Sequence, residues 1–551
     1  MSKNNFIIAQ TIKEFNFILS KIEKGKKLIC IPLNYELMLY CESIDFPFVN
    51  PSNYFKNDYH KKTIFKVLKI LNGLKFNQKL DYNITIEIIS FMRFRLNSFF
   101  YLKKILMALN HNKKNKFFFS GWIDMHPKSL DSYYVSDIAK LFAKEININF
   151  LSNFKIKSNK RINFLLSKKK IIDKSRKNII LSNIAYNFVR LILFSKRKYN
   201  FIILNSKINF FKYLILRLFN TQFYNFKIEK YSFKKENIKF SFKANNKIIK
   251  KYIILKMKKF QIYFENLFQF QKTVKKFFQI HKPDLVVTNI IRGKEGSYNC
   301  LAQEKKIPTL CIPHGTLSPY YNKYDKLYKK YISEAVFYKK ANYYGVQSKI
   351  CAEFLDQQKL NKKKFLYGNI IFSEKKKYES GTYYLHASTL KDCYNSVLYG
   401  CEYFFEFDKN LYSLNEIAKE ENIKIVVKIH PNQQHCQKYL ISKYKFLIFS
   451  NSKINKLLKK AKATISFSST VIEDSLISKV PVILLDLNNR YNHYKIKKNL
   501  SKNPLFYVKN ISNLKKVFKK IDKIKNFKFD MFTYSKSYKS NISDNLERIF
   551  K

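Results

Sequence analysis

Short runs of consecutive apolar residues recur along the chain, and stretches with a helical spacing of apolar residues lie between them. Apolar runs separated by amphipathic helices predict a parallel sheet with both faces covered, and therefore an α/β protein. The first series comprises "KLICIPLN" from Lys27, "YNFIILNS" from Tyr199, "DLVVTNI" from Asp284, "TLCIPHG" from Thr309 and "NYYGVQS" from Asn342. The second comprises "TYYLHAST" from Thr382, "IKIVVKIHP" from Ile423, "FLIFSNS" from Phe446, "ATISFSST" from Ala463 and "PVILLDL" from Pro481.

A polar segment bounded by glycines, 368–381, separates the two series and suits a linker. At 551 residues the chain is also longer than the ~250 to 300 residues at which single cores stop growing. We therefore predict two Rossmann-like domains, 1–378 and 379–551. Residues 74–198 and 210–276 are rich in Lys, Phe and Leu at helical spacing, which predicts helical elaboration of the first domain.

The composition leaves two explanations of the charge open. Lys and Arg number 105 against 39 Asp and Glu, a formal net charge of +66, and hydrophobic residues make up 46%. This hydrophobic content argues against disorder. The charge would suit a nucleic acid, an anionic lipid surface or another phosphate-bearing polymer. Abundant Lys, Asn, Ile, Phe and Tyr with scarce Gly, Pro and Trp would equally follow from AT-rich codon usage.

The cysteines do not indicate a metal site, and the apolar segments do not indicate a secretory signal or a membrane span. The eight cysteines include no Cys-x-x-Cys pair and are expected to be reduced core residues. The polar N-terminal stretch does not resemble a secretory signal, and Lys interrupts the apolar runs well before the ~18 residues that a membrane span needs. We expect a cytoplasmic protein, with a peripheral position on the inner face of the cell membrane as an open alternative.

Polar clusters follow the predicted strands at the ends where open parallel sheets bind their ligands. The candidate residues in the first half are Arg292, Glu295, His314 and Thr316, and those in the second half are His386, Lys428, His430, Ser468, Ser469, Thr470, Glu473, Arg490 and His493. Two such rims facing each other would form a cleft. A histidine placed at a strand end, such as His314 or His430, can donate to a phosphate or move a proton near neutral pH.

The stretch "ATISFSSTVIEDSLISKVPVILLD" carries two interpretations. A strand followed by small hydroxyl residues and a helix near Val471 predicts an anion site, because free backbone N–H groups and the helix dipole attract phosphate. Thr470 and Glu473 have the spacing of a capping box, which needs no ligand. Taken alone, the sequence favours the capping box.

An ordered set of motifs between Lys282 and Asp486 resembles bacterial surface-polysaccharide enzymes of the GT-B fold, in which two Rossmann domains face each other. The set is "PDLVVTNIIRGKEG", "IPTLCIPHGT", "YGVQSKICAEFL", "YGNIIF", "VVKIHPN" and "SFSSTVIEDSLISKVPVI". The His-Pro and Ser-Ser-Thr elements resemble polysialyltransferases and capsule Kdo transferases. The His-Gly-Thr element, with the other two, also resembles CDP-glycerol glycerophosphotransferases, and non-hydrolysing UDP-N-acetylglucosamine 2-epimerases are similar in shape.

The resemblance implies roles for most of these candidates. His430 and Lys428 would contact the donor phosphate, together with Ser468, Ser469 and Thr470. Glu473 would reach the nucleotide ribose, and His314 would lie by the acceptor as a base or positioning group. Glu295, before a glycine, is the nearby candidate for the acidic base of polysialyltransferases, although "RGKEG" departs from their paired-acid pattern. Arg292, His386 and Arg490 are candidate cleft residues without an assigned role.

These motifs together predict a metal-independent glycosyltransferase that moves a sugar from a nucleotide-sugar donor to a hydroxyl of a surface polysaccharide or glycolipid. No cofactor or metal is expected, because no Asp-x-Asp follows a strand where it could hold a divalent ion. Expected partners besides the donor and acceptor are an anionic membrane surface and polysaccharide export machinery. The alternatives are a CDP-polyol polyol-phosphate transferase, a non-catalytic GT-B relative in export or assembly, and a basic nucleic-acid-binding protein.

Overall fold

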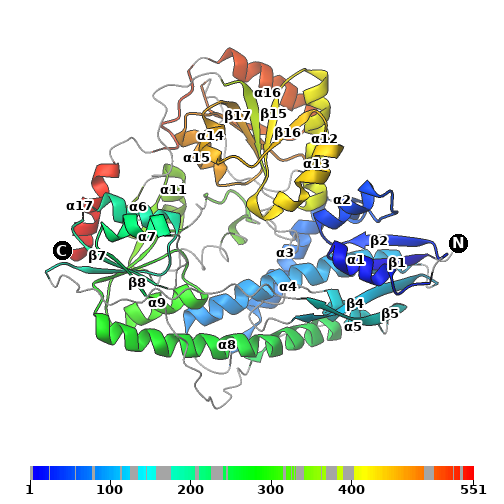
Figure 1. Cartoon of the computed structure of the whole chain (residues 1–551), viewed down its shortest axis with the longest axis horizontal. Helices are drawn as coiled ribbons and strands as arrows, with labels where there is room; N and C mark the ends of the chain where they lie inside the picture. Colours follow the sequence, from blue (N-terminus) through cyan, green and yellow to red (C-terminus); the bar gives the residue numbers. More distant parts are fainter. Residues whose placement is uncertain are drawn as a thin grey trace.

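Three parallel β-sheets, each in its own lobe, form the frame of the molecule (Figure 1). The structure is a computed structural model. It describes residues 4–23, 25–55, 57–76, 81–111, 114–124, 135–143, 145–156, 175–195, 197–204, 210–224, 240–242, 246–313, 318–323, 325–327, 329, 341–360, 363–367, 381–388, 402–488, 502–524, 526–533 and 538–551.

The middle lobe contains a seven-stranded sheet with a Rossmann strand order. Its strands are β6 (Asn178–Leu181), β7 (Asn200–Leu204), β8 (Thr221–Tyr224), β10 (Leu285–Thr288), β11 (Thr309–Cys311), β12 (Tyr343–Val346) and β13 (Lys364–Leu366). The order is β13-β12-β11-β10-β6-β7-β8, and every pairing is parallel. The chain builds β6 to β8 in one direction and then returns to the other side of β6 with β10, so the order reverses between β6 and β10.

The C-terminal lobe repeats this order in a six-stranded sheet. Its strands are β14 (Tyr383–Ala387), β15 (Ile425–Lys428), β16 (Leu447–Ser450), β17 (Ala461–Ser466), β18 (Val482–Leu485) and β19 (Leu505–Val508). The order β16-β15-β14-β17-β18-β19 is parallel throughout and reverses between β14 and β17. Each apolar run of the two predicted series forms a strand of the structure, because such runs are buried on both faces.

The N-terminal lobe holds a four-stranded parallel sheet that the sequence did not predict. Its strands β1 (Asn5–Ala9), β2 (Leu28–Pro32), β4 (Lys116–Asp124) and β5 (Ile148–Ile156) lie in the order β2-β1-β4-β5. Residues 74–198 therefore contain strands β4, β5 and β6 in addition to the predicted helices. The run from Lys27 also belongs to this sheet and not to the Rossmann sheet of the middle lobe.

Helices cover the sheets and join the lobes. They are α1 (Ile12–Leu19), α2 (Tyr35–Ser43), α3 (Asn57–Asn72), α4 (Tyr82–Leu109), α5 (Val135–Phe142), α6 (Tyr186–Phe194), α7 (Phe210–Arg217), α8 (Lys247–His281), α9 (Gly293–Glu304), α11 (Lys349–Gln357), α12 (Phe404–Glu420), α13 (Gln437–Lys443), α14 (Ile454–Leu458), α15 (Val471–Ile477), α16 (Ile511–Lys523) and α17 (Tyr538–Phe550). The short 3-10 helices η1 (Pro51–Tyr54) and η3 (Pro431–Cys436) and the antiparallel pair β3 (Lys75–Phe76) and β9 (Phe240–Ser241) complete the described elements. None of the described helices has the length and apolar character that crossing a bilayer requires.

The long helices α4 and α8 run from the N-terminal lobe to the middle lobe (Figure 1). Helix α4 packs tightly on α9, and a Cβ atom added at Gly296 would lie 2.6 Å from the Cβ of Asn83. The Asn83 amide donates to the carbonyl of Gly293 at 3.2 Å and to the Ser297 hydroxyl at 3.1 Å. The predicted helical character of these regions is thus partly confirmed, and its function is to fix one lobe to the other.

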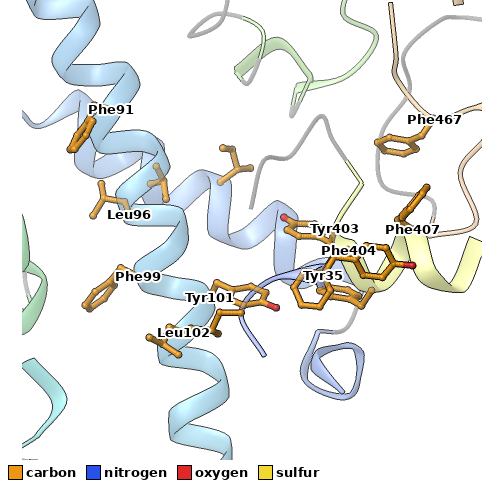
Figure 2. Packing of buried hydrophobic residues seen from close by; sticks show 14 of the residues in the cluster. Tyr35, Phe91, Leu96, Phe99, Tyr101, Leu102, Tyr403, Phe404, Phe407 and Phe467 are labelled. Carbon is orange, nitrogen blue, oxygen red and sulfur yellow. The ribbon is translucent and has the colours of Figure 1, made fainter. Parts of the chain in front are cut away.

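Aromatic residues form a continuous core between the N-terminal and C-terminal lobes (Figure 2). Phe55 stacks on Tyr101 at 4.8 Å and on Phe405 at 5.7 Å, while the rings of Tyr35 and Phe407 lie 5.6 Å apart. Large aromatic rings bury much apolar surface in offset or edge-on contacts. These two lobes are therefore held together by packing of the kind found inside single domains.

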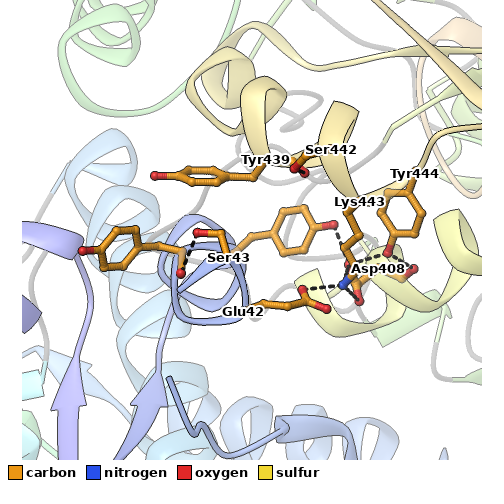
Figure 3. Close-up of polar contacts among 9 residues, drawn as sticks. Glu42, Ser43, Asp408, Tyr439, Ser442, Lys443 and Tyr444 are labelled. Atoms are coloured by element: carbon orange, nitrogen blue, oxygen red, sulfur yellow. Dashed lines mark hydrogen bonds and ion pairs between the residues drawn. The ribbon is translucent and has the colours of Figure 1, made fainter. Parts of the chain in front are cut away.

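A polar cluster lies beside this aromatic contact (Figure 3). The Lys443 ammonium binds Asp408 at 3.0 Å within the C-terminal lobe and Glu42 of α2 at 2.7 Å. The hydroxyl groups of Tyr35 and Tyr444 donate to one carboxylate oxygen of Asp408, at 2.8 and 2.7 Å. Burial raises the pKa of Tyr35, so its hydroxyl remains a donor.

The middle and C-terminal lobes meet at the carboxyl ends of their strands. Ser348, which caps α11 directly after β12, donates to the carboxyl group of Glu473 on α15, which follows β17. Two sheets of Rossmann order that meet in this way have the arrangement of the GT-B class, so the predicted fold class is confirmed. The last helix, α17, packs on the middle lobe through Ile542 and Leu546; the division at residue 378 stays a prediction.

Candidate functional site

In sheets of this order, ligands bind beyond the carboxyl ends of the strands where the order reverses. In the C-terminal lobe this switch point lies between β14 and β17, with β15 next to β14. The predicted candidates His386, Lys428, His430 and Ser468 to Glu473 come from these three strands and the turns that follow them. The structure therefore places Lys428, His430 and Ser468 to Glu473 at one edge, whereas His386 lies within β14. Arg490 and His493 lie outside the described residues.

Lys428 and His430 form the polar end of β15. The Lys428 ammonium donates to the carbonyl of Ile429 at 3.1 Å, and partial burial lowers its pKa. The carbonyl of the half-buried His430 accepts the N–H of Gln433 at 2.8 Å, and Pro431 opens η3. Because proline restricts the residue before it, the turn holds His430 in one backbone conformation.

Gln433 on η3 is a site residue that the sequence did not single out. Its side chain is 1% exposed, yet its amide nitrogen has no hydrogen-bond partner among the residues that the structure describes. Its amide oxygen lies 3.5 Å from the hydroxyl of Ser388, which directly follows β14. Unpaired buried amide groups are rare and costly, so this donor marks a place for an acceptor. Its position within "HPNQQ" at a strand end was the available signal.

His386 lies inside β14 and not at its end. The side chain is 1% exposed and stacks on Phe407 at 5.9 Å. Burial lowers its pKa, while the charge of Glu402 opposes this shift, so the ring is neutral near pH 7. Neither ring nitrogen forms a well-aligned hydrogen bond with a described residue. His386 lies inside the sheet, behind the switch point. This position suits a structural role in which the ring supports the site residues from within the sheet.

The turn after β17 differs from the predicted capping box. Thr470 is exposed and its side chain makes no cap hydrogen bond, and the Glu473 carboxyl group points to Ser348. The N–H of Val471 bonds instead to the Ser469 hydroxyl at 3.3 Å. The next two N–H groups bond to the carbonyls of Ser469 and Thr470 at 3.1 Å. The capping box is therefore wrong, because the chain satisfies this first turn through its backbone.

Glu473 is the most strongly perturbed acid at this edge. Its side chain is 3% exposed, and burial raises its pKa to about 8, with the nearby Asp474 adding to the rise and the Ser348 hydroxyl opposing it. The carboxyl group is therefore largely protonated at neutral pH. Ile350 of α11 packs against Ile472 and Leu476 around it. Glu473 thus lies in the contact between lobes, and its ribose role stays a prediction.

Glu295 lies at the switch point of the middle lobe. One carboxylate oxygen accepts the Ser182 hydroxyl and the N–H of Asn289, both at 2.8 Å, and the other accepts the Asn183 amide at 2.9 Å. Ser182 and Asn183 follow β6, which was hidden within the predicted helical region. Arg292 turns away to α4, where it binds the Ser90 hydroxyl at 2.6 Å and Glu87 at 3.3 Å.

The turn of His314 and Thr316 lies outside the described residues, but the chain that follows it contains a buried lysine. Lys329 donates to the hydroxyl of Ser318 at 2.8 Å and to the carbonyl of Pro319 at 2.7 Å. Burial lowers its pKa to about 7, and Asp325 opposes the shift. Lys329 therefore anchors the segment directly after this turn. The sequence did not single out Lys329, because one lysine among so many carries no signal.

Comparisons with known proteins find solved structures of low similarity. No family model and no curated protein matches the chain. UDP-GlcNAc 2-epimerases from Methanocaldococcus jannaschii and Neisseria meningitidis superpose with TM-scores of 0.41 and 0.40, at 14% and 13% identity, over 68% of this chain and 99% and 98% of theirs. A glycosyltransferase from Rickettsia africae gives a TM-score of 0.35 at 13% identity, over 68% of this chain and 94% of its own. The strand orders above carry the fold assignment.

Proposed function

We propose that the chain is a nucleotide-sugar-dependent glycosyltransferase that adds a sugar to a hydroxyl of a surface polysaccharide or glycolipid. The observation that carries the proposal is the carboxyl end of β15, next to the switch point between β14 and β17. The buried Gln433 amide nitrogen there has no hydrogen-bond partner among the described residues, and Lys428 and His430 come from the same strand end. A second Rossmann sheet lies next to this site, and the carboxyl ends of the strands of the two sheets face each other. This arrangement suits a phosphate-linked donor on one side and a separate acceptor on the other.

In this proposal the donor phosphate binds to side chains of β15 and η3. Lys428 supplies a positive charge, and its ammonium donates to the adjacent carbonyl of Ile429, which is a neutral partner. The Gln433 amide supplies the neutral donor, and His430 donates to the leaving oxygen as charge develops there. The hydroxyls of Ser468 and Ser469 line the same turn, while Glu473 would exchange Ser348 for a ribose hydroxyl.

The acceptor side would be built by the middle lobe. His314 is the proposed base or positioning group, on a turn whose following segment is anchored by Lys329. Three donors already occupy the Glu295 carboxylate, which leaves about one of its four lone-pair sites for an acceptor hydroxyl. Glu295 is therefore proposed to position the loops after β6 and β10. No group of three His, Cys, Asp or Glu side chains suited to a metal occurs in the described part of the chain.

The test is thermal stabilisation of the full chain by CMP, CDP, UDP and GDP, because a ligand that binds only the folded state raises the melting temperature. We expect one nucleotide to stabilise the protein selectively and His430→Ala to abolish the shift. His435→Ala is the matched control, since His435 lies on η3 but its ring is 3.7 Å from Glu36 of the N-terminal lobe. Equal shifts in both variants, or none in the wild type, would remove the proposed donor site.

Product analysis then separates the reaction classes. A glycosyltransferase leaves the acceptor without added phosphorus, whereas a polyol-phosphate transferase transfers the phosphate with the polyol. Binding of RNA that is insensitive to nucleotides, sensitive to salt and retained in His430→Ala would favour the nucleic-acid alternative.

A further inference from the structure

Helix α7 presents an apolar face to solvent in the middle lobe. The exposed residues are Phe211 at 77%, Leu214 at 44%, Ile215 at 52% and Leu218 at 66%. The spacing of Phe211, Leu214 and Ile215 places them on one side of the helix, and Leu218 follows directly after its last residue. Leu216 is fully buried in the core of the lobe, and Tyr213 packs on Phe223 at 5.2 Å, so the helix is anchored by its other side.

The sequence segment that contains this face is basic. Residues 174–228 contain eleven Lys and Arg and no Asp or Glu. Within this segment the guanidinium of Arg217 bonds to the Tyr213 hydroxyl at 2.9 Å, and that of Arg197 lies 5.0 Å from the centre of the Phe219 ring. Two of the lysines are paired with acids from other segments, Lys177 with Asp284 at 3.1 Å and Lys198 with Glu547 at 2.6 Å, and the other basic residues of the segment keep its charge positive.

We propose that the exposed face of α7, formed by Phe211, Leu214, Ile215 and Leu218, docks the protein on an anionic lipid bilayer. Apolar side chains on one face of a short helix can enter the acyl boundary, while flanking Lys and Arg extend to the phosphate groups of the lipids. The proposal does not depend on the reaction that the enzyme performs, although a glycolipid acceptor would lie in the same surface.

A second copy of the chain is a poorer occupant of this face. A two-fold contact would place the same surface against itself and bring two basic segments together. Like charges in such a contact repel, whereas anionic headgroups neutralise them. The charge therefore favours lipid over self-association.

The experiment is co-sedimentation of the full chain with vesicles of phosphatidylcholine alone or mixed equally with phosphatidylglycerol. We expect binding to the mixed vesicles that is at least about tenfold tighter than to the neutral ones and that weakens with salt. Ile215→Gln with Leu218→Gln is expected to lower the partition into mixed vesicles about tenfold. Tyr412→Gln with Ile441→Gln is the control, because these residues are 59% and 53% exposed in the C-terminal lobe.

A second measurement keeps the proposal testable if the double variant folds poorly. In Leu218→Trp, the new indole is expected to be quenched by brominated lipid in anionic vesicles, against the background of the native Trp122. The proposal is overturned if the double variant binds like the wild type, if neutral and anionic vesicles bind equally, or if the indole is not quenched. A dimer in sedimentation velocity that the double variant abolishes would likewise overturn it in favour of self-association.

Discussion

Each of the two Rossmann sheets has a glutamate at the same distance in sequence from the end of its fourth strand, but the two glutamates bond to different partners. Glu295 stands seven residues after the end of β10, and Glu473 stands seven residues after the end of β17, each on the helix that follows the fourth strand of its sheet. Glu295 bridges its own switch point through three hydrogen bonds. Glu473 instead leaves its sheet and bonds to Ser348 of the other lobe.

The N-terminal sheet repeats the first arrangement. Glu14 on α1 accepts the N–H of Gln10 after β1 at 2.7 Å and the hydroxyl of Ser120 on the neighbouring β4 at 3.1 Å. Two sheets are thus closed by a carboxylate at the point where the strand order reverses. In the third sheet the corresponding glutamate, Glu473, bonds to Ser348 of the middle lobe. Buried polar atoms without a partner among the described residues lie at the strand ends of both Rossmann sheets, in Thr288 and Asn289 at the end of β10 and in Gln433 after β15. The two Rossmann sheets therefore differ in what their glutamate joins, since Glu295 joins loops of its own sheet and Glu473 joins two lobes.

The largest expected effect comes from Glu473→Gln. The folded carboxyl group has a pKa of about 8 against 4.5 for an ordinary glutamate, so the folded state holds a proton that the unfolded state releases between these values. Stability of the wild type therefore falls as pH rises from about 4.5 to about 8, by about 3–5 kcal/mol. The amide that replaces the carboxyl group cannot ionise, so the variant should gain this amount relative to wild type at about pH 9 and little at about pH 5.

Urea unfolding of wild type and variant at both pH values measures this difference directly. Glu304→Gln is the control, because Glu304 is exposed at the end of α9 and should give the same small difference at both pH values. A difference for Glu473→Gln that does not change with pH would show that Glu473 ionises normally and that its contact with Ser348 is not a buried one.

The second largest effect is expected from Glu295, which joins the loops at the switch point of the middle lobe. Glu295→Ala removes the acceptor of three hydrogen bonds and leaves donors from the loops after β6 and β10 unpaired. Hydrogen bonds to a charged group and unpaired donors of this kind correspond to about 2–4 kcal/mol. We expect a lower urea midpoint for Glu295→Ala and an unchanged one for Glu304→Ala. An unchanged midpoint with lost transferase activity would instead identify Glu295 as a base with no part in holding the loops.

The sequence predicted much of the fold because its signals were local. Apolar runs that are buried on both faces are visible without knowledge of their partners, and polar residues directly after them mark the edge of the sheet. Strand β6 was missed because "NIIL" is short and lies within a Lys-rich stretch, and β5 was missed because Asn and Lys interrupt it. Strand β6 belongs to the middle sheet, and the four-stranded sheet was absent from the expected architecture because β2 alone of its strands was among the predicted runs.

The contacts that each candidate site residue makes could not be predicted from local sequence signals in the same way. The partners of Glu295 after β6 lie 112 and 113 residues away in sequence, and Ser348 lies 125 residues from Glu473. Contacts at such separations depend on how the sheets are arranged, and a single sequence holds no local trace of them. The same reason explains the wrong capping box, since the spacing of Thr470 and Glu473 fitted a local bond that a distant partner replaced.

The smallest effect separates the two roles of Ser348. Its hydroxyl caps α11 by accepting the N–H of Cys351 at 3.1 Å, and it donates to Glu473. Ser348→Ala should cost about 1–2 kcal/mol, roughly half from the lost cap and half from the lost partner of a buried carboxyl group. In the Glu473→Gln background the free-energy contribution of the bond from Ser348 to residue 473 changes, while the contribution of the Ser348 cap to α11 remains. A double-mutant cycle therefore isolates the contact between the lobes. Additive effects in that cycle would mean that Ser348 serves its helix alone, and the lobes would then be joined by the apolar packing of Ile350 against Ile472 and Leu476.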